Sequence, residues 1–328
     1  MTELFNGGEM DSFLPTDNTV IESTAQPTGY DSNFCRCALG VGVGAVLVDP
    51  DVTYAETIRW AAQTEGWFHF DLYLQEASGT ASQLLTLRTA SAAIFRIVAT
   101  KVSSSTHTLD LQYLDSGASW QSGGTVTVPT SRQTFDIYWD IQASGSLDLF
   151  VGGTKRIEFA GDLSHLSGVE FARLHRAFNV PTYWSQVFAD TESTVGHKLF
   201  TISPASNGAN TAWTGGYTEV DEIAYSDGDF INSGTANQVE TFAGTTPTLT
   251  GYVVQSVTVA ARGKTDGSGP SNLQLALRSS STDYFSASKA LDTGYEPYQN
   301  IWETNPATSA AWVNTAISGL QFGVKSIT

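Results

Sequence analysis

Two carboxylates and a phenol share one face of a predicted strand. Asp136, Tyr138 and Asp140 alternate with apolar residues, so their side chains point outward together. Paired carboxylates catalyse glycoside hydrolysis when about 5–9.5 Å apart. A rise of about 3.3 Å per residue puts the Cα atoms of Asp136 and Asp140 roughly 13 Å apart. We therefore expect no catalysis here. A carbohydrate- or partner-contact face with Tyr138 as a stacking platform, or a plain solvated sheet, are the alternatives.

A second cluster of carboxylates lies in a glycine-containing turn. Oxygen ligands from one loop are what calcium takes. The turn lacks the Asp-x-Asp-x-Asp-Gly order and the closing glutamate of the EF-hand loop. We expect no metal site, with calcium as the alternative at Asp221, Glu222, Asp227 and Asp229.

No motif predicts a cofactor. Gly40, Gly42 and Gly44 have dinucleotide-binding spacing, but β-branched residues and Pro50 follow, so no helix begins there to hold a pyrophosphate. The five histidines show no paired-ligand spacing. The cysteines, in the segment 35–37, are expected to be small buried side chains. We expect no catalytic residues and no cofactor.

The elements that position these residues are strands. Alternation of period two is clear over residues 67–74, and again over 134–141 and 146–151, which a short turn joins into a hairpin. Similar runs recur about every ten residues. A last strand over 183–190 is expected to close the sheet against the N-terminus. The pattern predicts an antiparallel jelly-roll β-sandwich over residues 1–200.

The texture changes after residue 200. Paired glycines and the acidic turn predict a linker and entry segment over 201–242. Strand patterns over 253–262 and 272–278 then predict a second, smaller β-sandwich over 243–328. It ends in a short helix whose stripe and C-terminal cap are Trp312, Ala316, Ile317, Leu320 and Gly323. The predicted fold class is therefore all-β.

Composition excludes several partners. The chain has 328 residues, and 33 acidic against 16 basic residues give a net charge of -17. This charge disfavours nucleic acid and anionic lipid, since both bind through lysine and arginine. No apolar run reaches the roughly 20 residues of a membrane span. The first residues show no signal-peptide pattern, so we expect synthesis in a cytoplasm without Sec export.

Several short motifs resemble known families. The strands WFHFDLYL (67–74), FDIYWDI (135–141) and LDLFVGGTK (147–155) resemble those of concanavalin A-like, or laminin G-like, jelly rolls. A second set resembles, in the same order, the C-terminal region of virion proteins of tailed bacteriophages. It comprises YWSQVFAD (183–190), AWTGGYTEVDEI (212–223), DGDFINSGTA (227–236), VTVAARGKTD (257–266), NPATSAAW (305–312) and GLQFGV (319–324).

The resemblance implies a non-enzymatic structural component of a phage particle. Its place would be a tail, a baseplate or a fibre, with host-surface glycan adhesion as one role. Capsid decoration or a head fibre is the alternative place, and a tailspike glycan depolymerase is the alternative of another class. The expected partners are other virion proteins, further copies of the chain and host-surface carbohydrate. The expected location is the virion.

Overall fold

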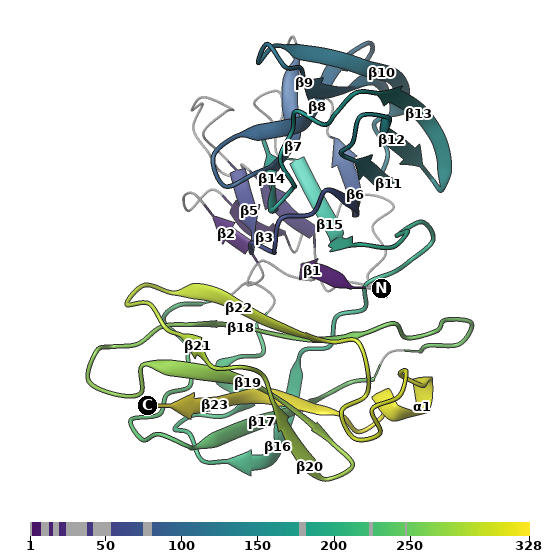
Figure 1. The fold of residues 1–328 in the computed structure, drawn as a ribbon. Coiled ribbons are helices and arrows are strands. Elements are labelled where there is room, and N and C mark those ends of the chain that lie inside the picture. Colours follow the sequence, from purple (N-terminus) through teal and green to yellow (C-terminus); the bar gives the residue numbers. More distant parts are fainter. Residues whose placement is uncertain are drawn as a thin grey trace. The chain divides into compact units, whose positions relative to one another are not determined.

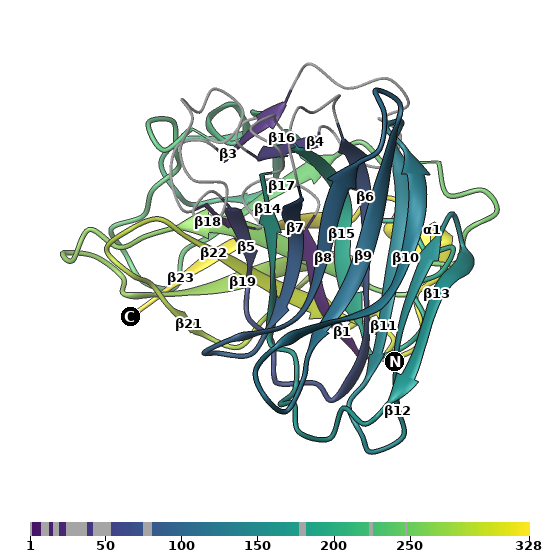
Figure 2. The same cartoon turned by 90° about the horizontal axis from the view of Figure 1, so that it is seen from above.

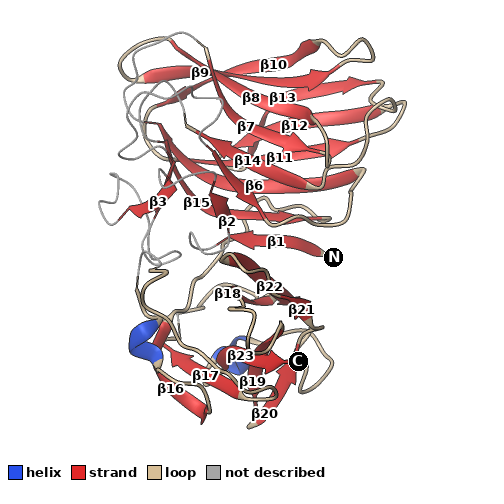
Figure 3. Ribbon diagram, turned by 90° about the vertical axis from the view of Figure 1, so that its left-hand side faces the viewer, coloured by secondary structure: helices blue, strands red, loops and turns tan. Residues whose placement is uncertain are grey.

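The protein divides into two compact units, residues Met1–Leu199 and Phe200–Thr328. The computed structural model describes residues 2–7, 13–15, 20–23, 38–41, 54–74, 81–176, 182–222, 226–246 and 248–328. Strands dominate both units, with only short helical turns among the described residues (Figure 1, Figure 3). The predicted all-β fold class is confirmed.

The first unit contains two antiparallel sheets. The strands of the first sheet are β1 (Glu3–Gly7), β3 (Val20–Ser23), β4 (Ala38–Val41), β6 (Glu65–Leu74), β11 (Gln133–Asp140), β12 (Gly145–Val151), β13 (Thr154–Gly161) and β15 (Thr182–Asp190). Their order is β13-β12-β11-β6-β15-β4-β3, and β1 also pairs with β15. The pairing of Phe5 with Ala189 confirms that the strand near residue 190 closes against the N-terminus.

The second sheet has the order β10-β9-β8-β7-β14-β5-β2, and β7 to β10 lie side by side in Figure 2. These strands are β2 (Phe13–Pro15), β5 (Tyr54–Thr57), β7 (Ser82–Arg88), β8 (Ala93–Lys101), β9 (Thr106–Leu114), β10 (Trp120–Pro129) and β14 (Phe171–His175). Their non-consecutive order shows that the chain crosses repeatedly between the two sheets, as a jelly roll requires.

The core of the first unit follows the predicted alternation. In β6, the inward side chains are at most 4% exposed, and the same holds for alternate residues of the neighbouring strands. Burying each large apolar side chain contributes about 1.5–3 kcal/mol. Among these buried residues are Phe68, Phe70, Leu72, Leu74, Phe95, Ile97, Leu109, Leu111, Ile137 and Trp139.

The second unit is a smaller sandwich. A six-stranded sheet has the order β16-β17-β23-β19-β20, with β21 beside β19, and β18 pairs separately with β22. The bounds are β16 (Pro204–Thr211), β17 (Val239–Gly244), β18 (Val257–Gly263), β19 (Asn272–Ser279), β20 (Thr282–Phe285), β21 (Lys289–Ala290), β22 (Glu296–Trp302) and β23 (Gln321–Ile327). Val259 of β18 packs with Leu273, Leu275 and Leu277 of β19 in one core.

The segment 201–242 differs from the expected linker. It supplies β16 and most of β17 to the six-stranded sheet, so the second unit begins at Phe200. A short 3₁₀-helix, η2 (Tyr217–Glu219), follows β16. Polar composition concealed β16 because it is an edge strand without a single buried side chain. Alternating hydrophobicity signals only strands with one buried face.

The C-terminal helix is present but short. It is a single turn, α1 (Asn314–Ile317), that buries Ile317. The residue with positive φ after it is Gly319, at +82°, so the cap predicted at Gly323 is wrong. Gly323 lies within β23, where a Cβ would overlap the carbonyl oxygen of Glu240. This glycine is needed for close strand approach.

Replacing Gly323 by alanine should therefore destabilise the second unit. We expect a loss of about 1–3 kcal/mol in the free energy of unfolding, because the methyl group forces β17 and β23 apart. Urea unfolding of the full chain measures it. Gly294→Ala is the control, since nothing lies within 4 Å of a Cβ there. Equal stability of the two variants would contradict the close approach.

Candidate functional site

Three aromatic side chains form a row on the outer face of the first sheet. The Trp67 ring lies 4.9 Å from Tyr138 and 5.3 Å from Phe150, between ring centroids. Strand β11 separates β6 from β12, so the rings of Trp67 and Phe150 meet across β11. All three are only partly buried. We call Trp67, Tyr138 and Phe150 the aromatic row.

Hydrogen-bonding groups border the aromatic row. The Tyr138 hydroxyl donates to Glu65 Oε1 at 2.9 Å. Burial, and then this hydrogen bond, raise the pKa of Tyr138, so its phenol stays protonated at neutral pH. At the other end, Lys155 Nζ lies 2.6 Å from Asp148 Oδ2 and 5.7 Å from the Phe150 ring centroid. The row thus combines partly exposed rings with the exposed carboxylate of Glu65 and the ammonium group of Lys155, whereas Asp148 is 4% exposed.

Asp136 does not belong to this accessible surface. It is 0% exposed, whereas Tyr138 and Asp140 are partly exposed as expected. His69 Nδ1 donates to Asp136 Oδ1 at 2.6 Å, and Thr194 Oγ1 donates to the same oxygen at 2.7 Å. The carboxylate therefore fastens β6, β11 and the segment after β15 together. The prediction that Asp136 contacts a ligand is therefore wrong. Alternation along a strand shows to which face of the sheet a side chain points, but it does not show whether other residues cover that side chain.

The carboxylates of the acidic turn take part in two separate interactions, one with Arg262 and one between Glu222 and Asp229. Arg262 donates to both carboxylate oxygens of Asp227, at 2.9 and 3.1 Å. Burial raises the pKa of Glu222, and a hydrogen bond with Asp229 adds to the shift. No group of three or more His, Cys, Asp or Glu side chains is placed to hold a metal ion in the described part of the chain. The calcium alternative at Asp221, Glu222, Asp227 and Asp229 stays a prediction.

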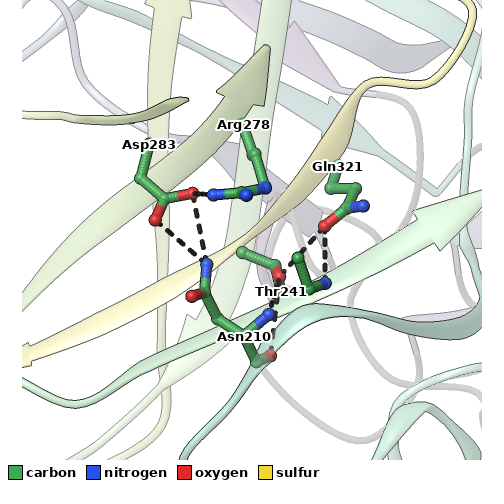
Figure 4. A network of polar contacts seen from close by, with 6 residues as sticks. Asn210, Thr241, Arg278, Asp283 and Gln321 are labelled. Carbon is green, nitrogen blue, oxygen red and sulfur yellow. Dashed lines mark hydrogen bonds and ion pairs between the residues drawn. The ribbon is translucent and has the colours of Figure 1, made fainter. Parts of the chain in front are cut away.

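A polar network on the six-stranded sheet is self-contained (Figure 4). Asn210 Nδ2 donates to both Asp283 oxygens, at 3.2 and 3.1 Å, and Arg278 Nη1 donates to Asp283 at 2.7 Å. Thr241 Oγ1 accepts a hydrogen bond from the backbone N–H of Asn210 at 3.0 Å and donates one to Gln321 Oε1 at 3.3 Å. These bonds tie the edge strand β16 to its sheet where the β16–β17 register shifts. Their role is structural.

The remaining motifs lie largely outside the described residues. Gly40 lies in strand β4, opposite Tyr183 of β15. A position within a strand agrees with the expectation that no helix begins at this glycine. The rest of that glycine-rich run, Cys35 and Cys37 lie outside the described residues. No described helix has the length and apolar character to cross a bilayer.

Sequence reasoning found Tyr138 but missed its neighbours. The hairpin turn alone gives the register of Tyr138 against Asp148. Phe150 could have been placed beside Tyr138 from that register. Trp67 lies opposite Tyr138 and Glu65 lies opposite Asp140, yet no local turn joins β6 to β11. Their pairing follows only from the three-dimensional fold.

Comparisons with known proteins identify no family. No family model matches, and no curated protein matches. Solved structures that resemble the chain include a carbohydrate-binding module from Bacillus subtilis, at 9% identity and a TM-score of 0.33, covering 55% of this chain and 95% of that one. The T. cruzi calreticulin globular domain has 8% identity and a TM-score of 0.42, covering 59% and 89%. An alginate lyase from Pseudomonas aeruginosa has 13% identity and a TM-score of 0.31, covering 57% and 86%. Likenesses this distant decide nothing about function.

Asp136 and Asp140 should respond very differently to substitution. Asp136→Ala leaves a buried imidazole and hydroxyl without their acceptor, so we expect unfolding to cost about 3 kcal/mol less. Asp136→Asn keeps an acceptor oxygen, so it should lower the free energy of unfolding by less than Asp136→Ala does. Asp140→Ala, at a partly exposed position, should stay within about 0.5 kcal/mol of the parent. Urea unfolding measures all three, and equal losses at positions 136 and 140 would contradict the assignment.

Proposed function

We propose that the first unit binds carbohydrate without catalysis, through the aromatic row. The observation that supports this is the contact of three partly exposed rings on one sheet face. Ring faces stack against the apolar faces of sugars, and the accessible carboxylates of Glu65 and Asp140 accept hydrogen bonds from sugar hydroxyls. Tyr138, the stacking platform expected from the sequence, is the middle strand's contribution.

Binding is favoured over hydrolysis because the two neighbouring carboxylates, Glu65 and Asp140, already accept hydrogen bonds from other side chains. Glu65 and Asp140 lie directly opposite each other on β6 and β11. Directly opposite Cβ atoms are about 4.5–5.5 Å apart, which is near the carboxyl separation that glycosidases use. Each carboxylate already accepts a hydrogen bond, Glu65 from Tyr138 and Asp140 from Gln142. A general acid must instead carry a proton to the leaving oxygen.

We further propose that the protein is a structural component of a tailed-phage particle. The support is the ordered set of motifs between residues 183 and 324 that resembles virion proteins. A tail, baseplate or fibre position, with several copies, suits weak sugar contacts because multivalency raises their avidity. Capsid decoration is the alternative position. Mass spectrometry of purified particles tests both, and absence of the chain from virions would contradict them.

Trp67→Ala should weaken binding to host-surface polysaccharide. Loss of a central aromatic anchor costs about 2 kcal/mol, so we expect roughly a 30-fold lower affinity. Tyr138→Phe keeps the ring and should lose only a few-fold. Affinity electrophoresis against purified host glycans measures both variants.

The matched control is Phe230→Ala, because Phe230 is 49% exposed and lies in the second unit. Its affinity should equal that of the parent. The proposal fails if Phe230→Ala and Trp67→Ala weaken binding alike, or if Trp67→Ala leaves it unchanged.

The carboxylate pair should not cleave glycans. Incubating the parent protein with a glycan that it binds should release no new reducing ends above the level of a Glu65→Gln, Asp140→Asn double variant. A reducing-sugar assay measures this. Release by the parent that the double variant abolishes would instead support the depolymerase alternative.

A further inference from the structure

Two carboxylates of like charge lie directly opposite each other beside the aromatic row. Glu65 of β6 pairs in register with Asp140 of β11. Glu65 is exposed and Asp140 is partly exposed, so solvent reaches both side chains. Like charges directly opposite on neighbouring antiparallel strands repel each other and destabilise the pairing. A bound cation between the two carboxylates would relieve that repulsion.

The hydrogen bonds of this carboxylate pair come from neutral donors. The Tyr138 hydroxyl donates to Glu65 Oε1 at 2.9 Å, and the side-chain amide of Gln142 donates to Asp140 Oδ2. No lysine, arginine or histidine of the described residues forms an ion pair with either carboxylate. A neutral donor removes no charge, so both negative charges remain.

The negative charge is felt by the middle ring of the aromatic row. Burial is the first cause that raises the pKa of Tyr138, and the hydrogen bond with Glu65 is the second. The charges of Glu65, Asp140 and Asp148 raise this pKa further, because negative charges nearby disfavour a phenolate. The same charges would favour an ammonium group that lies against the ring.

The lysine of this face is held at the opposite end of the aromatic row. Lys155 Nζ lies 2.6 Å from Asp148 Oδ2 and 3.2 Å from Glu158 Oε1. Its strand, β13, is three strands away from β6 in the sheet, which is roughly 14 Å. Asp148 is directly opposite Tyr138 and 4% exposed, and its Oδ1 has no hydrogen-bond partner among the described residues. The carboxylates beside the middle ring thus keep unused capacity to accept hydrogen bonds.

The rings next to the carboxylate pair also suit a cation. Trp67 and Tyr138 are partly exposed, and their ring centroids are 4.9 Å apart. The faces of tryptophan and tyrosine rings attract an ammonium group within about 6 Å of the ring centroid. An amino sugar carries an ammonium group and an apolar ring face on one small ring, so it matches both features.

We propose that the aromatic row binds a glycan of amino sugars whose amines are free and protonated. This inference rests on the proposed carbohydrate binding and names its sugar class. One sugar ring stacks on Trp67 or Tyr138, and its ammonium group donates to Glu65 and Asp140. Each carboxylate has two acceptor oxygens, so it accepts from the ligand as well as from its present donor. Such charge-assisted bonds are about twice as strong as bonds between neutral groups.

The probes are a β-1,4-linked glucosamine oligomer, in mildly acidic buffer that keeps its amines protonated, and its fully N-acetylated counterpart. Calorimetric titration of the full-length protein should give about tenfold tighter binding of the amine form. Glu65→Gln and Asp140→Asn should each reduce this preference to about threefold, and the double variant should abolish it.

The matched control is Glu158→Gln. It makes the same change of charge on the same sheet, at a side chain that is 72% exposed and three strands from β6. The preference for the amine form should stay at its parental value in this variant. An equal loss of preference in Glu158→Gln and Glu65→Gln would overturn the inference.

The outcomes separate this inference from the proposed function. Equal affinity for the two oligomers, with both weakened by Trp67→Ala, would leave carbohydrate binding in place and overturn the selection of amines. Binding of the oligomers that Trp67→Ala leaves unchanged would contradict the inference and the proposed function together. Failure of the amine form to bind the parent protein would contradict the inference.

Attraction of any polycation to a chain of net charge -17 is the competing explanation. Oligolysine of the same charge as the glucosamine oligomer tests it, because it has ammonium groups but no sugar ring. We expect oligolysine to bind at least tenfold more weakly than the glucosamine oligomer. Equal binding of the two would overturn the inference.

Discussion

The register of β6 against β11 is the constraint on which the first unit depends. It places Phe70 opposite Phe135 in the core and, on the other face, Trp67 opposite Tyr138. A slip of one residue would send every core side chain of a strand to the outer face, and the outer residues to the core. The buried bond between His69 and Asp136 joins these two strands at the same place. The packing of the core and the geometry of the aromatic row are thus set together.

The two outer faces of the first unit differ in charge. Around the aromatic row lie the carboxylates of Glu65, Asp140 and Asp148, whereas four arginines gather on the second sheet. A net charge of -17 therefore describes no single face of the molecule. The two sheets of one sandwich thus carry outer faces of different chemistry.

Much of the fold could be predicted from alternation, and much of the site could not. The alternating pattern predicts strands with one buried face, such as β6 and β11, and it also predicts the hairpin of β11 and β12. The edge strand β16 did not, because it buries no side chain. Asp136 looked like its neighbour Asp140 because sequence shows direction but not cover. The contacts of Arg59, Arg88 and Arg173 with the Phe171 ring join residues far apart in the sequence, and only the sheet order brings them together.

The most direct test of the account follows the individual tryptophans during glycan binding. Fluorine-labelled tryptophan gives one NMR resonance for each of the eight tryptophans, assignable by substitution. On titration with a bound host polysaccharide, the resonance of Trp67 should shift, while those of Trp139 and Trp184, both 0% exposed, should stay in place. A Trp67 resonance that stays fixed while a tryptophan of residues 200–328 shifts would contradict the claim that the aromatic row is the contact surface.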